Sequence, residues 1–298
     1  MNKQKKIPIQ AIRLSVTTLV IIAIVLFKSI MSNKVEERID TVLKDLPNQM
    51  VIYDDISVDI FGFSTHIYDI SINVPGQEPI TIDEIVINSI DQDHNIPRYL
   101  DLEINGIENN TNALMLNPQS ALFAKNLGVE KLSSNIALKY NYKQDKKSLE
   151  LDELSFTTNG VAEIEFEAEF HNISSFEAVI KQFATEAKYI TVAEASLEFD
   201  DMSLTNAILK TIAQDSKKTL TEVKAQLTAQ LTKERDRNAK RGHTAVVEIQ
   251  EAMISFIKDP QSFDMSVEPK EPVSFKKIMR MRTQKEFVQA LNFKVSAN

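Results

Sequence analysis

One acidic stretch begins like a metal-binding loop. The sequence Asp91-Gln-Asp93-His94-Asn95 has the alternating oxygen donors of an EF-hand calcium loop, which also needs Gly at its sixth position and Glu at its twelfth. Ile96 and Leu102 occupy those positions. The stretch is therefore predicted to be a solvated turn and not a calcium site.

A second acidic stretch has the spacing of a strand. Glu163, Glu165, Glu167 and Glu169 alternate with apolar residues, so their side chains would form one row, spaced by about 7 Å. Such a row could attract a basic partner or divalent ions. It is also typical of the wet face of a strand, where charge discourages edge-to-edge pairing, and we favour that interpretation.

Patterns that would indicate catalysis are missing from the sequence. The histidines have no metal-ligand spacing, and no His-Glu-x-x-His, Gly-x-Ser-x-Gly or P-loop pattern occurs. The chain has no Cys, which excludes disulfides, thiol catalysis and zinc–thiolate sites. We therefore predict no catalytic residue, no metal ligand, no cofactor and a non-enzymatic protein.

Basic residues gather in two groups near the C-terminus. A basic residue near an anionic membrane contributes about 1 kcal/mol to binding, although attraction to the chain's own acidic strands is an alternative role. The first group is our candidate contact for lipid headgroups or a protein partner: Lys233, Arg235, Arg237, Lys240 and Arg241. The second group is Lys276, Lys277, Arg280, Arg282 and Lys285.

The N-terminus carries the longest apolar run of the chain. Residues 14–27 are too short to cross a hydrocarbon core of about 30 Å, but residues 14–31 with their flanks are long enough. No small-residue cleavage site follows, so an uncleaved signal anchor is favoured over a cleaved signal peptide or a buried helix. The predicted anchor residues are Leu14, Leu19, Val20, Ile21, Ile22, Ile24, Val25, Leu26 and Phe27.

The basic tip at residues 1–13 favours a cytoplasmic N-terminus. Lys28, Lys34 and Arg38 partly balance this preference. We expect a single-pass protein of a bacterial inner membrane, with the remainder of the chain in the periplasm and the lipid bilayer as its first partner.

Net charge is distributed unevenly. Residues 33–212 carry about −18 and residues 213–298 about +5. The acidic body argues against nucleic acid as a partner, because phosphates require clustered Lys and Arg.

Hydrophobic periodicity predicts an α+β fold: an N-terminal transmembrane helix, then a mostly antiparallel sheet with a C-terminal helical hairpin packed on it. Asp83-Glu84 and Asp152-Glu153 each shift the apolar phase by one residue, as a β-bulge would. The expected domains are the tip at 1–13, the anchor at 14–31, a stalk helix at 32–47, a β-rich region at 48–203, and a helical hairpin with closing strands at 204–298.

The order of these elements resembles bacterial envelope proteins of the AsmA and YdgA type. The resemblance rests on the anchor followed by Ile56-Ser-Val-Asp-Ile60, Tyr68-Asp-Ile-Ser-Ile72 and Ile82-Asp-Glu-Ile-Val-Ile87. It implies tethering to the inner membrane, an elongated antiparallel sheet in the periplasm and a role in envelope lipid homeostasis. It supplies no catalytic residue.

Two functions follow from these observations. In the first, the apolar face of the sheet contacts lipid or hydrophobic cargo. In the second, the domain is a periplasmic adaptor or assembly module that binds a protein of a membrane complex. An open apolar face would favour the first function, whereas a closed two-layer core would favour the second.

Overall fold

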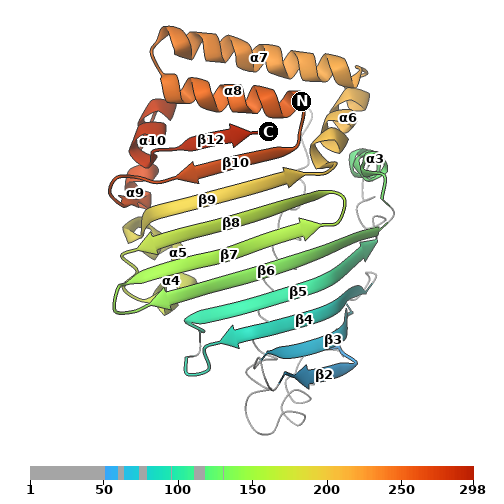
Figure 1. Cartoon of the computed structure of the whole chain (residues 1–298), viewed down its shortest axis with the longest axis vertical. Helices are drawn as coiled ribbons and strands as arrows, with labels where there is room; N and C mark the ends of the chain where they lie inside the picture. Colours follow the sequence, from blue (N-terminus) through green and yellow to red (C-terminus); the bar gives the residue numbers. More distant parts are fainter. Residues whose placement is uncertain (1–50, 60–63, 74–78, 95, 111–117, 130) are drawn as a thin grey trace. The chain divides into compact units, whose positions relative to one another are not determined.

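A computed structural model describes residues 51–59, 64–73, 79–94, 96–110, 118–129 and 131–298 (Figure 1). Contacts divide the chain into two compact units, Met1–Asn88 and Ser89–Asn298, and each is described by itself. The predicted tip, anchor and stalk helix lie outside the described residues. Among the helices that the structure does describe, none combines the length and apolarity needed to cross a membrane.

The first unit contains short antiparallel strands. Strands β1 (Val51–Ile52) and β2 (Asp55–Val58) both pair with β3 (Thr65–Ile72), and β3 pairs with β4 (Ile80–Ile90). Isoleucines fill the buried positions of β3 and β4, because β-branched side chains pack well on a pleated surface.

The second unit is built on one antiparallel sheet. Its strand order is β5-β6-β7-β8-β9-β10-β12, and the short β11 pairs with β9. The predicted mostly antiparallel sheet with several helices is confirmed. The strands are β5 (Tyr99–Asn110), β6 (Lys131–Lys143), β7 (Ser148–Thr158), β8 (Ala162–His171), β9 (Thr191–Asp201), β10 (Ser262–Val267), β11 (Val273–Ser274) and β12 (Lys294–Ala297).

Helices lie between several of these strands along the chain. The longest two, α7 (Leu220–Lys240) and α8 (Thr244–Lys258), form a hairpin in which α8 contacts β12 and β10 (Figure 1). A capping box of Thr219 and Glu222 begins α7. The others are α3 (Pro118–Leu127), α4 (Phe176–Lys181), α5 (Phe183–Glu186), the 3-10 helix η2 (Ala187–Tyr189), α6 (Leu204–Asp215), α9 (Phe275–Ile278) and α10 (Gln284–Leu291).

The predicted bulge in β7 is confirmed. Lys139 pairs with Glu153 and the next residue of β6 pairs with Leu151, so Asp152 has no partner on β6. On the other side of β7, the same insertion offsets the register against β8. The bulge keeps Leu149 and Leu151 on the same face as the apolar residues that follow it. At the corresponding Asp83-Glu84 of β4, the register with β3 has no offset.

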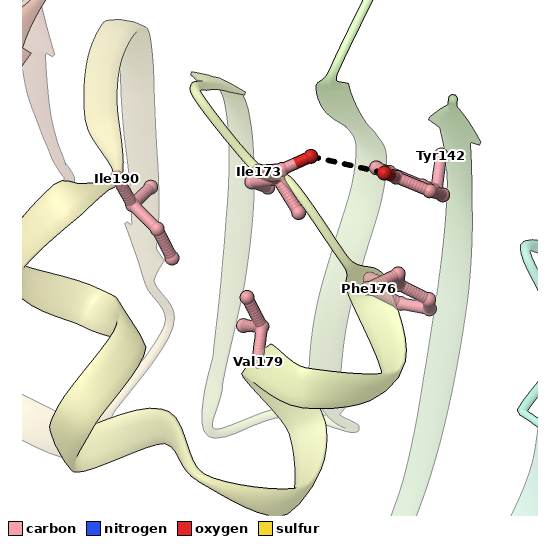
Figure 2. Packing of buried hydrophobic residues seen from close by; sticks show 5 residues of the cluster. All are labelled: Tyr142, Ile173, Phe176, Val179 and Ile190. Carbon is pink, nitrogen blue, oxygen red and sulfur yellow. Dashed lines mark hydrogen bonds between the residues drawn. The ribbon is translucent and has the colours of Figure 1, made fainter. Parts of the chain in front are cut away.

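The α4 end of the sheet has its own buried cluster (Figure 2). Phe176 stacks on Tyr142 with ring centroids 5.2 Å apart. The Tyr142 hydroxyl donates a 2.9 Å hydrogen bond to the carbonyl of Ile173, so its polar end is satisfied within the core. Val179 and Ile190 complete the cluster and fix the short helices against the strands.

The polar face of the sheet is strongly acidic. Glu165 of β8 pairs with Ser155 of β7 and Glu198 of β9, and directly paired residues share a face. Burial, followed by the charges of Glu153 and Glu167, raises the pKa of Glu165. The acidic row predicted from the sequence is thus one part of a wider carboxylate surface.

We expect Phe176→Ala to lower the free energy of unfolding by about 3–5 kcal/mol, because it removes a buried aromatic ring. Phe183→Ala, on the next helix, removes a ring that is mostly exposed and should change stability by no more than about 0.5 kcal/mol. Urea denaturation of the purified chain measures both. Equal losses for the two variants would contradict the assigned core.

We expect Glu165→Gln to raise the melting temperature by about 1–2 °C near neutral pH, a typical scale for a surface change of about 0.5 kcal/mol. Because its pKa is raised in the folded chain, ionised Glu165 destabilises the fold above the ordinary pKa, and the penalty disappears on acidification. The gain should therefore vanish at about pH 3. Thermal unfolding across pH tests this, with the exposed Glu248→Gln of α8 as control. A lower melting temperature at neutral pH would contradict it.

Candidate functional site

A continuous apolar face crosses the second unit's sheet. Because directly paired residues of an antiparallel sheet point to the same side, the register aligns apolar residues from neighbouring strands. A second bulge, at Ala193 of β9, keeps Val192 on this face as well. The rows across β6, β7, β8 and β9 are Ile136–Phe156–Ile164–Phe199, Leu138–Leu154–Phe166–Leu197 and Tyr140–Leu151–Ala168–Ala195.

Helices cover the margins of this face. At one end Phe176 of α4 packs on Tyr140, with ring centroids 5.7 Å apart. At the other end a cluster that contains Ala207 of α6 packs with Val161 and Ala162. On the side of the last strands, Phe256 of α8 lies 5.9 Å from Phe199 and 5.4 Å from Phe263 between ring centroids.

The middle of the face is exposed. Leu154 and Phe156 of β7 keep 41% and 42% of their surface accessible. On β5, by contrast, Leu100, Leu102 and Ile104 are fully buried. We call the part of the face around Leu154 and Phe156 the open strip. It is an apolar surface on a rigid strand, bordered by covered surface, and it can bind an apolar ligand without any catalytic group.

The predicted basic group is only partly assembled. Lys233, Arg237 and Lys240 line a shallow groove of about 670 Å³ along α7, together with Lys258 of α8. Small residues, among them Ala225 and Ala229, also line the groove. Asp236 is the acidic residue in this lining, so the groove has a net positive charge that can attract an anionic group. Lys258 is a member that the sequence did not indicate.

The other two predicted basic residues lie elsewhere. Arg235 donates to Asp236 through Nη2 at 2.7 Å and Nε at 3.0 Å, and its Nη1 lies 3.9 Å from Glu251. Arg235 does not line the groove, although its partner Asp236 does. Arg241 is the C-cap of α7 and is exposed. The sequence cluster is therefore divided among different faces of the hairpin.

The predicted solvated turn is confirmed for Gln92 and Asp93, which are exposed, but it is wrong for Asp91, whose side chain is buried. Its carboxylate accepts the backbone N–H groups of Arg98 at 2.8 Å and Asp93 at 3.0 Å, and it lies 2.7 Å from Nδ1 of His94. Burial opposes ionisation, but these hydrogen bonds together lower the pKa of Asp91 below its ordinary value. Asp91 organises its loop.

A cleft of about 350 Å³ beside this loop is lined by His94, Arg98, Tyr142 and Glu177, among others. Another hollow, of about 500 Å³, lies between α8 and α10 and has a mostly apolar lining that includes Met253 and Phe287. Within the described ranges, no group of three or more His, Cys, Asp or Glu residues could hold a metal ion.

Sequence reasoning missed two sets of exposed apolar residues. It predicted the apolar face but not the exposure of Leu154 and Phe156, which look like any other core positions in a strand pattern. It also missed Ile180 and Phe183, which are exposed in the connection between β8 and β9. Their signal was present: Val179 and Ile180 are adjacent in a short helix, so both cannot face the same core.

Comparison with known proteins gives a partial match. A family model described as "Uncharacterized protein" matches residues 155–298, a range that begins within β7 and includes the helical hairpin. None of the curated proteins compared with the chain matches it.

Proposed function

We propose that this chain is a non-enzymatic protein of the bacterial inner membrane whose sheet contacts lipid or another hydrophobic cargo in envelope homeostasis. Residues 14–31 would anchor it as a single-pass protein, with its N-terminus in the cytosol and its C-terminal domain in the periplasm. The exposure of Leu154 and Phe156 in the middle of a continuous apolar face carries the proposal.

The physics of the open strip favours an aliphatic ligand. Neighbouring strands lie about 4.8 Å apart, so the apolar rows from β6 to β9 extend over about 14 Å. A hydrocarbon chain laid on this surface would gain about 0.8 kcal/mol for each buried methylene. The acidic residues that pair across the middle of these strands, such as Glu165 and Glu198, lie on the opposite face, so the strip itself is apolar.

A separate observation favours the adaptor function. Glu163, Glu165, Glu167 and Glu169 share the polar face with Glu198 and other carboxylates. A basic protein segment would relieve their mutual repulsion, which adds to the effect of burial in raising the pKa of Glu165. In this second candidate function, a protein of a membrane complex binds the polar face, and the apolar face is a structural surface only.

Photo-crosslinking of the full chain in membranes separates these functions. A benzophenone side chain at position 156 should form a phospholipid adduct, whereas one at position 155, on the polar face, should not. Adducts are identified by mass spectrometry of the purified chain. Equal lipid yields at the two positions, or only protein adducts, would contradict lipid binding; protein adducts confined to position 155 would favour the adaptor.

A charge on the open strip should disturb binding. We expect Leu154→Lys to reduce the lipid adduct at position 156 by at least about tenfold, which corresponds to about 1.4 kcal/mol, because the ammonium group would be desolvated by the ligand. Ser155→Lys is the matched control. It introduces the same charge at the adjacent position, but on the acidic face, where the charge is favourable.

A further inference from the structure

Four large apolar side chains project into solvent on neighbouring elements of the second unit. Ile180 of α4 is 57% exposed, Phe183 of α5 is 60%, Tyr189 of η2 is 58%, and Met279, the C-cap of α9, is 71%. We call these residues the apolar tip. Single exposed apolar residues are common on protein surfaces, but four on consecutive contacting elements require an explanation.

The elements that carry the apolar tip are fixed to one another. Helix α4 contacts α5, α5 contacts η2, and η2 contacts α9. The N–H of Phe275 donates a 3.0 Å hydrogen bond to the carbonyl of Ile190, which attaches α9 to the end of η2. Inside, Phe176 and Val179 are buried in the core cluster. The elements that carry the tip are therefore packed together at one end of the strands (Figure 1).

Basic residues lie beside the apolar tip, most of them on the α9 side, whereas on α4 Lys181 is paired with Glu177 and α5 carries Glu186. Lys188 places its Nζ 4.7 Å from the centroid of the Tyr189 ring. Lys276, Lys277 and Arg280 are exposed on and just after α9, and residues 275–282 contain no acidic side chain. The fold therefore places apolar residues from α4, α5 and η2 near the second basic group. The sequence of that group alone does not reveal these neighbours.

We propose that the apolar tip and these basic residues form a docking surface for an anionic lipid bilayer. Tyr, Phe, Ile and Met can enter the interfacial layer, while Lys and Arg contact lipid phosphates. Basic residues near the surface strengthen binding to anionic lipid, and this contribution decreases with ionic strength. The positive charge of Lys and Arg beside the tip favours an anionic bilayer over an uncharged apolar protein as the partner. The inference rests on the proposed function only for the presence of the chain at a membrane.

The docking surface adjoins the apolar face of the sheet. Phe275 of α9 stacks on Phe170 of β8, with ring centroids 6.1 Å apart, and Phe170 pairs with Leu149 at the end of that face. Docking would therefore bring this end of the apolar face to the lipid surface. The far end of β9, near Met202, would lie about 35 Å away along the strand.

The absence of Cys from the chain allows a direct test with single labels. Phe183→Cys and Met279→Cys, each carrying an environment-sensitive fluorophore, are reconstituted as full chains into vesicles that contain phosphatidylglycerol and a spin-labelled lipid. Met202→Cys is the matched control, since Met202 is 54% exposed and follows the opposite end of β9. Ile22→Cys reports on the predicted anchor.

We expect several-fold stronger quenching at positions 183 and 279 than at position 202. Lys276→Glu with Lys277→Glu and Arg280→Glu should abolish most of the excess at position 279. The same charge change on α7, with Lys233→Glu, Arg237→Glu and Lys240→Glu, should leave the quenching unchanged. High salt should weaken the excess, as expected for partly electrostatic docking.

The outcomes separate this inference from the proposed function. Quenching at position 22 but not at 183 or 279 would overturn the docking surface and leave the membrane anchor in place. No quenching at any position would overturn both. A blue shift at 183 and 279 without lipid quenching would mean that a second copy covers the tip, which also overturns the inference. Loss of the lipid adduct in Leu154→Lys, with docking intact, would place the two contacts on separate surfaces.

Discussion

The separation of the sheet into one apolar and one acidic face depends on single residues inserted into its strands. Side chains of a strand alternate between faces, so an uninterrupted β7 would place Leu149 and Leu151 on one face and Leu154 and Phe156 on the other. The bulge at Asp152 removes this conflict. Ala193 does the same for β9. Without these insertions, Leu149 and Leu151 of β7 and Val192 of β9 would lie on the carboxylate face.

This constraint produces two surfaces of opposite chemistry on one layer. The polar face gathers carboxylates, and the pKa of Glu165 is raised there by burial first and by the neighbouring carboxylates second. The apolar face is covered at its margins by Phe176, Phe256 and the α3–α6 cluster, but not around Leu154 and Phe156. A sheet with helices only at its margins buries less apolar surface than a two-layer fold of the same size, and the remaining exposure is what a hydrophobic ligand would use.

Cations lie on both strands and helices of this unit. On β6, Lys139 and Lys143 form ion pairs with Asp101 and Glu150. The α7 groove and the surroundings of the apolar tip are separate surfaces formed by helices, and the second combines cations with exposed apolar side chains. The proposed membrane contact and the proposed ligand surface thereby meet at Phe170 and Phe275 and do not compete for the same residues.

The mostly antiparallel sheet, the bulge at Asp152 and the acidic row could be predicted from the sequence, because each depends on the period of side chains along a local segment. The pairing of Arg235 with Asp236, the burial of Asp91 and the exposure of Leu154 and Phe183 could not. Burial and side-chain pairing depend on contacts between segments that are distant in the sequence, and the periodicity of one segment does not reveal those contacts.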